Sequence, residues 1–343
     1  MQLLSFRKPY EMLPAVSEKQ MLTHGFAYQH GTFLRDIDLE DIDTVLQQEG
    51  TFVWVGLHEP SASFLKKIQA KFELHELALE DAYLAHQRPK VEEYGRLLFV
   101  VLHTIELVKG DLQMGELHLF LGQRFLLSIC HRTTIDTAKV RQRCEEDPQR
   151  LVHGPSFLLY AIMDCVVDLY QPVVYYWVDA IEDLETQLFH RHLDQKGLEQ
   201  LYTLRHKVQI LRSTALPLLD VCATLMRSHH NSDLISHDMT LYFRDTHDHL
   251  NQIVRITENI RETLLAAMQM NLSLVAAHQN EVVKRLAGWG AIVFVPTIVF
   301  SLYGMNFQHM PELQWQYGYP FTLVATAMVC VWLYRRFKKN DWL

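Results

Sequence analysis

Cysteine is scarce in this chain of 343 residues: it has five, and no two of them form a Cys-x-x-Cys pair. That scarcity excludes a disulfide scaffold and a cysteine-rich zinc module. Positive charge is in the minority, with 32 Lys and Arg against 40 Asp and Glu and a net charge of −8, which argues against a nucleic-acid partner. The N-terminal segment lacks the long apolar core of a secretory signal peptide, so we expect no such peptide.

Charge of either sign is missing from two long stretches near the C-terminus. No Asp, Glu, Lys or Arg occurs in residues 286–311, and none in residues 313–334. Each stretch can supply most of the roughly 20 apolar residues that a membrane-spanning helix needs, although two buried core helices would also account for them. We therefore expect a first transmembrane helix over residues 286–307, an external loop over 308–317, a second transmembrane helix over 318–337 and a basic tail over 338–343.

Basic residues flank the two stretches and predict their orientation. The cations that lie just outside them are Lys284, Arg285, Arg335, Arg336, Lys338 and Lys339, whereas the connecting segment has no Lys or Arg. Because positive residues stay on the cytoplasmic side, both termini should be cytoplasmic in a multi-pass protein of the inner or plasma membrane.

The preceding 285 residues divide into two parts by pattern. In residues 1–154, apolar runs such as 52–55 and 97–102 alternate with amphipathic stretches, which predicts a cytoplasmic α/β sandwich domain. Ser61 is expected to cap a helix that reaches Phe72, and Gly122-Gln123 should turn a hairpin. Residues 155–285 have a helical period and form the second part. Its last helix should be a long stalk that continues straight into the first membrane helix. Two membrane helices enclose no pore, so a conduit would have to be an oligomer.

Several short motifs resemble those of the CorA-type magnesium channel family. The first membrane stretch ends in GMN (304–306), MPEL (310–313) follows, and upstream LED (79–81), HQRPKVE (86–92) and YFRD (242–245) are similar as well. The resemblance implies a funnel-shaped homopentamer in the lipid bilayer that passes Mg²⁺, with Co²⁺ and Ni²⁺ as further divalent cations. It also implies passive, potential-driven influx that intracellular Mg²⁺ gates.

The resemblance also assigns roles to residues. Gly304, Met305 and Asn306 would form the selectivity filter, with Glu312 in the external loop attracting cations. Five amide oxygens suit a hydrated Mg²⁺ because this ion sheds water reluctantly. The expected pore-lining residues are Asn280, Val283, Leu286, Gly290, Phe294, Thr297 and Ser301. Among them, Leu286 and Phe294 could close the pore by dewetting.

For the gate, the resemblance implies regulatory metal sites between subunits. Asp81 and Asp245 match one such site, and Glu80 and Asp164 match a second. A Mg²⁺ that bridges such carboxylates would hold neighbouring subunits closed, because carboxylate oxygens and waters are its preferred ligands. Without the resemblance, each of these acids would be interpreted as a solvated or salt-bridged side chain.

Two other functions remain open at this point. A zinc transporter of the same superfamily would fit the topology, although its relatives carry Gly-Ile-Asn in place of GMN. A membrane-anchored metal sensor that does not transport would also fit. The acids and histidines of residues 229–249 could hold a borderline metal or form a solvated helix face: His229, His230, Asp233, His237, Asp238, His247, Asp248 and His249. No nucleotide-binding loop or nucleophile–base motif indicates an enzyme, and we expect no organic cofactor.

Overall fold

The computed structural model describes residues 21–133, 136–146, 148–190, 193–228, 234–305, 310 and 315–343. The chain divides into two compact units. One consists of Met1–Asp183 and Glu199–Leu264, and the other of Leu184–Leu198 and Leu265–Leu343. Each unit is described separately below.

A seven-stranded mixed sheet forms the centre of the first unit, in the order β2-β1-β3-β7-β6-β5-β4. The strands are β1 (Leu22–Gln29), β2 (Thr32–Asp36), β3 (Thr51–His58), β4 (Lys90–Tyr94), β5 (Leu97–Val108), β6 (Asp111–Leu121) and β7 (Phe125–His131). Among these described strands, β3 and β7 pair parallel and all other neighbours pair antiparallel. These two central strands are buried almost throughout, which explains their continuous apolar runs.

Short helices cover one face of the sheet: η1 (Leu39–Asp41), α2 (Ile42–Leu46), α3 (Ala62–Phe72) and α4 (Glu76–Leu84). As expected, Ser61 caps α3 by accepting a hydrogen bond from the Phe64 amide at 3.3 Å. The expected hairpin is also confirmed, since β6 and β7 pair antiparallel and the Gly122 amide donates to the Phe125 carbonyl at 2.9 Å. Phe64, Leu65 and Ile68 of α3 are buried in the core against the strands.

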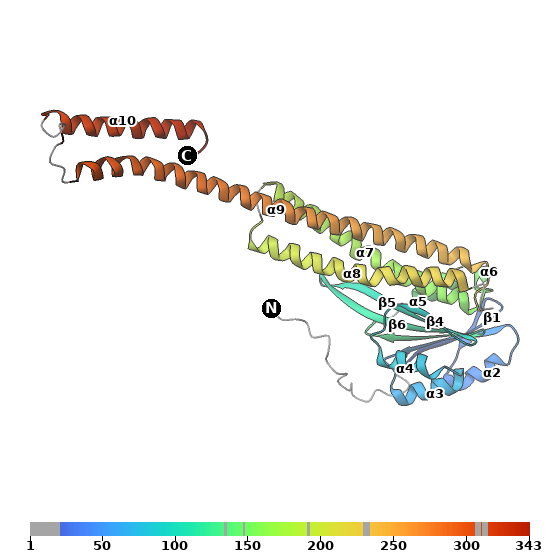
Figure 1. Cartoon of the computed structure of the whole chain (residues 1–343). Helices are drawn as coiled ribbons and strands as arrows, with labels where there is room; N and C mark the ends of the chain where they lie inside the picture. Colours follow the sequence, from blue (N-terminus) through green and yellow to red (C-terminus); the bar gives the residue numbers. More distant parts are fainter. Residues whose placement is uncertain are drawn as a thin grey trace. The chain divides into compact units, whose positions relative to one another are not determined.

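Further helices lie on the other face of the sheet (Figure 1). They comprise α5 (Thr137–Glu145), α6 (Pro148–Leu151) and α7 (Pro155–His190). The Tyr170 hydroxyl of α7 donates to the His103 carbonyl of β5 at 2.9 Å, and Tyr170 is fully buried. The first half of α7 presents few side chains to solvent, so it serves as part of the core.

Two further helices extend this helical layer. They are α8 (Gln195–Ser228) and α9 (Met239–Tyr303). An ion pair between Arg212 of α8 and Glu258 of α9 joins them. The expected continuity is confirmed, because α9 runs from the first unit into the second with no break near residue 285.

The second unit contains the C-terminal part of α9 and helix α10 (Gly318–Lys339). Helix α9 ends at Tyr303, four residues before the expected end at 307, where the Gly304 amide closes a last turn on the Phe300 carbonyl at 2.9 Å. Helix α10 starts at the expected residue and continues two residues past 337. Within the described residues, three helices are long and apolar enough to cross a membrane, namely α7, α8 and α9, and α10 is not among them.

Candidate functional site

The seven residues expected to line a pore lie on one face of α9. Their spacings are three or four residues, and each helical residue turns by about 100°, so their side chains project in one general direction. All seven are exposed in the chain: Asn280, Val283, Leu286, Gly290, Phe294, Thr297 and Ser301. No atom lies within 4 Å of the position a Cβ would take at Gly290. Nothing in the described part of this chain therefore covers that face.

The opposite face of α9 packs against α10. The Cys330 Sγ approaches the Ile292 carbonyl at 3.7 Å, and the side chain of Leu343 lies 3.3 Å from where a Cβ at Gly288 would sit. Farther along, Val295 and Val299 line an apolar groove together with residues of α10. At about 100° per residue, these contacts lie about half a turn from Gly290 and Ser301. Helix α10 thus leaves the candidate pore face free.

Polar atoms on the candidate pore face are few. The Thr297 hydroxyl donates to the Val293 carbonyl of its own helix at 2.9 Å, so its lone pairs remain available as acceptors. At the end of α9, Gly304 and Met305 are exposed. Asn306 of the expected filter and Glu312 of the expected loop lie outside the described residues.

Asp81 lies on α4 and is already hydrogen-bonded to two neighbours. Its Oδ2 accepts from Lys90 Nζ at 2.6 Å, and its Oδ1 accepts from Gln87 Nε2 at 3.1 Å. Glu80, the preceding residue, is exposed. A regulatory cation at Asp81 would therefore meet an ammonium group that already occupies one of its oxygens.

Asp245 and Asp164 share one neighbourhood on α9 and α7. Asp245 is exposed and comes within 4.0 Å of His249 Nε2, and it borders a surface hollow with Arg150 and Tyr160. Burial raises the pKa of Tyr160 to about 12, and the negative charges of Asp164 and Asp245 add to this rise. Both carboxylates thus act on the same phenol.

Asp164 itself is buried and paired. Arg143 Nη1 donates to Asp164 Oδ2 at 2.5 Å, while Nη2 of the same guanidinium donates to Asp168 at 2.9 Å. Burial raises the pKa of Asp164, and the charge of Arg143 opposes that rise. This carboxylate is thus less accessible to a cation than Asp81 or Asp245.

The structure does not bring the expected acid pairs together within one chain. Asp81 and Glu80 lie on α4, whereas their expected partners Asp245 and Asp164 lie on α9 and α7. Among the described residues, no three His, Cys, Asp or Glu side chains are grouped so that they could hold a metal. Of the histidine-rich stretch, His229, His230 and Asp233 lie outside the described residues, and its other members form no such group.

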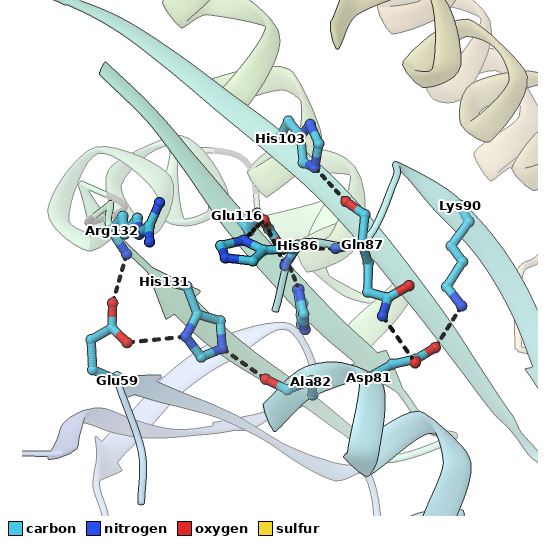
Figure 2. Close-up of polar contacts among 11 residues, drawn as sticks. Glu59, Asp81, Ala82, His86, Gln87, Lys90, His103, Glu116, His131 and Arg132 are labelled. Atoms are coloured by element: carbon cyan, nitrogen blue, oxygen red, sulfur yellow. Dashed lines mark hydrogen bonds and ion pairs between the residues drawn. The ribbon is translucent and has the colours of Figure 1, made fainter. Parts of the chain in front are cut away.

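Sequence reasoning missed the residues that surround Asp81. Lys90 and Glu92 belong to a motif that was read only as a family signature, and their charges alternate in the sequence. Glu116 lies on β6 and accepts hydrogen bonds from the amides of His86 and Gln87 at 2.8 and 3.3 Å (Figure 2). The charge alternation could have suggested an ion pair, but no local signal linked Glu116 to residues thirty positions away.

Comparisons with known proteins place this arrangement in a family. Residues 49–339 match the family described as CorA-like Mg²⁺ transporter protein. The cobalt/magnesium transport protein CorA of Thermotoga maritima is 30% identical over 318 residues, which cover 90% of this chain and 89% of that protein. Among solved structures, the complete CorA magnesium transporter of Methanocaldococcus jannaschii has a TM-score of 0.77 at 20% identity and covers 93% of this chain and 99% of its own.

A second solved structure, that of the full-length CmaX protein, has a TM-score of 0.75 at 18% identity and covers 94% of this chain and all of its own. At these identities, the two structures support the fold alone: an N-terminal α/β domain followed by long helices. The family match covers most of the sequence, and the apolar stretch of α9 agrees with it. The chain is therefore a membrane protein that belongs to the CorA-like Mg²⁺ transporter family.

Proposed function

We propose that this chain forms a homopentameric channel through which hydrated Mg²⁺ enters the cell passively, with Co²⁺ and Ni²⁺ as further permeant ions. Five copies would arrange the C-terminal part of α9 around a common axis. The Thermotoga maritima relative is named a cobalt/magnesium transport protein, which supports the choice of ions.

The observation that carries this proposal is the free face of α9. Seven exposed residues follow that face for about six turns, while α10 packs half a turn away. Copies of α9 around an axis would bury this face toward a lumen and leave α10 toward lipid.

The chemistry of the face suits a hydrated dication. Mg²⁺ keeps its water shell, so acceptors such as the Thr297 hydroxyl and the Asn280 amide could hydrogen-bond coordinated waters without replacing them. Asn306 of the GMN filter would do the same at the outer mouth, with Gly304 and Met305 shaping the turn. Leu286 and Phe294 offer rings of apolar side chains at which a narrow pore can dewet and close.

The membrane potential is a sufficient driving force. At 100 mV, inside negative, it contributes about 2.3 kcal/mol per charge, and therefore about 4.6 kcal/mol for a dication. For orientation, we propose that both termini are cytoplasmic. The membrane-spanning part would be residues 286–307 and 318–337, with residues 308–317 outside, where Glu312 would raise the local cation concentration.

We propose that Mg²⁺ bound between neighbouring subunits closes the channel, with Asp81 of one subunit facing Asp245 of the next. The two acids lie on different elements, and Asp245 is exposed on α9, where a neighbouring copy could reach it. The second expected pair, Glu80 and Asp164, is less favoured because Arg143 already neutralises Asp164.

The test is Mg²⁺ entry into proteoliposomes that hold the purified full-length protein, with an inside-negative potential and a parallel Zn²⁺ trace with a pH dye. We expect Mg²⁺ entry that increases with voltage and moves no protons, together with a pentamer by native mass spectrometry. Zn²⁺ flux coupled to protons without Mg²⁺ entry would overturn the proposal in favour of a zinc transporter. No flux of any ion would favour a sensor.

A further inference from the structure

The ammonium group of Lys90 lies between two carboxylates on the surface of the α/β unit. Its Nζ is 2.6 Å from Asp81 Oδ2 and 2.8 Å from Glu92 Oε1. The other oxygen of Glu92 accepts from the Tyr94 hydroxyl at 2.8 Å. One positive charge thus compensates two negative charges, and the group as a whole keeps a net charge of −1.

A strained segment holds Lys90 in this position (Figure 2). Ala85 and His86 both have positive φ angles, 52° and 62°, which residues with a side chain rarely adopt. This turn directs two successive amides at the Glu116 carboxylate, and His103 Nε2 lies 2.7 Å from the Gln87 carbonyl. These hydrogen bonds to Glu116 and His103 fix the backbone of the segment, which places the side chains of Gln87 and Lys90 within hydrogen-bond distance of Asp81.

The Glu116 carboxylate, which anchors this segment through the His86 and Gln87 amides, stays ionised over a wide pH range. Burial opposes ionisation, but the hydrogen bond with His118 and the backbone amide of His86 lower the pKa of Glu116 to about 2. Glu116 therefore stays a carboxylate at physiological pH and keeps accepting from the segment. The position of Lys90 is set by this anchored backbone as well as by its own ion pairs.

A divalent cation would compete for the same oxygens. The two carboxylate oxygens that Lys90 contacts both lie within 2.8 Å of its Nζ atom. A dication in place of the ammonium group would interact with each oxygen more strongly than the single positive charge does. The side chains of Asp81 and Lys90 are each 26% exposed, so an ion from solvent can reach them. The flexible four-carbon stem lets the ammonium withdraw without moving the backbone.

We propose that Lys90 is a tethered competitor for the regulatory cation, and that Glu92 joins Asp81 as its second carboxylate. The inference rests on the proposed role of Asp81 in the gate. It adds that the closing concentration of Mg²⁺ is set by displacement of an ammonium group of the chain itself. Without bound Mg²⁺, the charge of Lys90 would reduce the repulsion between the Asp81 and Glu92 carboxylates. The same charge would raise the Mg²⁺ concentration needed to occupy the site.

The test compares inhibition of flux by internal Mg²⁺ in full-length variants. Lys90→Met removes the ammonium and should lower the half-inhibiting Mg²⁺ concentration by about 5-fold, the scale of one partly exposed ion pair. Lys90→Arg keeps a cation and should stay near wild type. Glu92→Gln should shift the curve the opposite way, by about 3-fold, because a dication loses more than an ammonium when one carboxylate becomes neutral.

A matched control is Lys71→Met, which breaks a similar ion pair with Asp43 at 2.8 Å on the same unit and should leave the curve unchanged. A purely structural ion pair would make Lys90→Met and Glu92→Gln shift in the same direction, and that result would overturn the inference. As a readout independent of transport, the rise of Tm with added Mg²⁺ in detergent should begin at lower concentration for Lys90→Met.

Asp81→Asn separates this inference from the proposed function. If it raises the half-inhibiting concentration while Lys90→Met leaves it at the wild-type value, the gate stands and the competitor role is wrong. If Asp81→Asn also leaves the curve unchanged, Asp81 is not part of the gate and both proposals fail. All variants are compared at equal monodisperse yield.

Discussion

Helices α7 and α9 are both apolar enough to cross a membrane, yet their surroundings are opposite. The most apolar stretch of α7 has a mean hydropathy of 1.5 and is 78% buried inside the chain, whereas that of α9 has 1.8 and is only 6% buried. The chain itself covers α7 with the sheet, while the described residues leave most of the α9 stretch uncovered. Composition selects candidate spans, and burial by the rest of the chain separates a core helix from one that needs lipid or other subunits.

The largest expected effect comes from placing one charge in each helix. Leu158→Lys puts an ammonium at a fully buried position of α7, where an unpaired charge costs more than the chain's net stability allows. We expect no monodisperse protein. Phe294→Lys, at a side chain that is 62% exposed on α9, should fold and assemble but block Mg²⁺ flux, because five cations would face the lumen. Size-exclusion profiles and proteoliposome flux check both.

Either of two outcomes would contradict the contrast between a buried α7 and an uncovered α9. A well-behaved Leu158→Lys protein would mean that α7 is not a core helix. Undiminished Mg²⁺ entry through Phe294→Lys would mean that this face of α9 does not line the pathway.

The proposed filter provides the next prediction. Asn306→Ala removes the amide oxygens proposed to hold the hydrated ion, so Mg²⁺ flux should fall to background while the oligomer persists by native mass spectrometry. Gln308→Ala is a nearby control that removes an amide outside GMN and should retain flux. Normal flux through Asn306→Ala would refute the amide ring.

Charge reversal at the surface of α9 tests the gate with a smaller effect. Asp245→Lys replaces an exposed carboxylate by a cation, which should raise the half-inhibiting internal Mg²⁺ concentration by about 10-fold or more. Asp248→Lys makes the same change at a more exposed neighbour and should behave as wild type. Equal inhibition curves for the wild type and Asp245→Lys would remove Asp245 from the gate.

A separate prediction concerns pH and the α/β unit. Burial lowers the pKa of His24 from 6.5 to about 4, where its ring packs against Phe26 and Trp54. Between these values the unfolded chain binds a proton that the folded chain excludes, so stability should fall as the pH drops from 6.5 to 4. At about 1.36 kcal/mol per pKa unit, the loss reaches at most about 3 kcal/mol.

His24→Phe keeps the ring stacking and removes the titration, so its Tm should change less between pH 6.5 and 4 than that of the wild type. Thermal unfolding of the full-length protein in detergent measures this difference. Parallel Tm profiles for the two proteins would show that His24 does not contribute to acid sensitivity.

Local patterns predicted much of the fold because they depend on neighbours in sequence. The Ser61 cap, the Gly122-Gln123 hairpin and the unbroken stalk all follow from residues within a few positions of one another. The seven expected pore positions also share a face because helical spacing alone determines it. The apolar run does not by itself show where α9 ends, whereas the structure ends the helix at Tyr303 with a last turn closed by the Gly304 amide.

The sequence by itself determined the alternation of strands and helices, the apolar stretches and the family, because each depends on periodicity or on short motifs. Only the tertiary structure decided that α7 is buried, that α10 lies opposite the free face of α9, and that Lys90 lies between Asp81 and Glu92. These facts depend on which distant elements meet. The anchor at Glu116 shows the reason: a carboxylate on β6 holds a turn thirty residues earlier, and no local pattern encodes that contact.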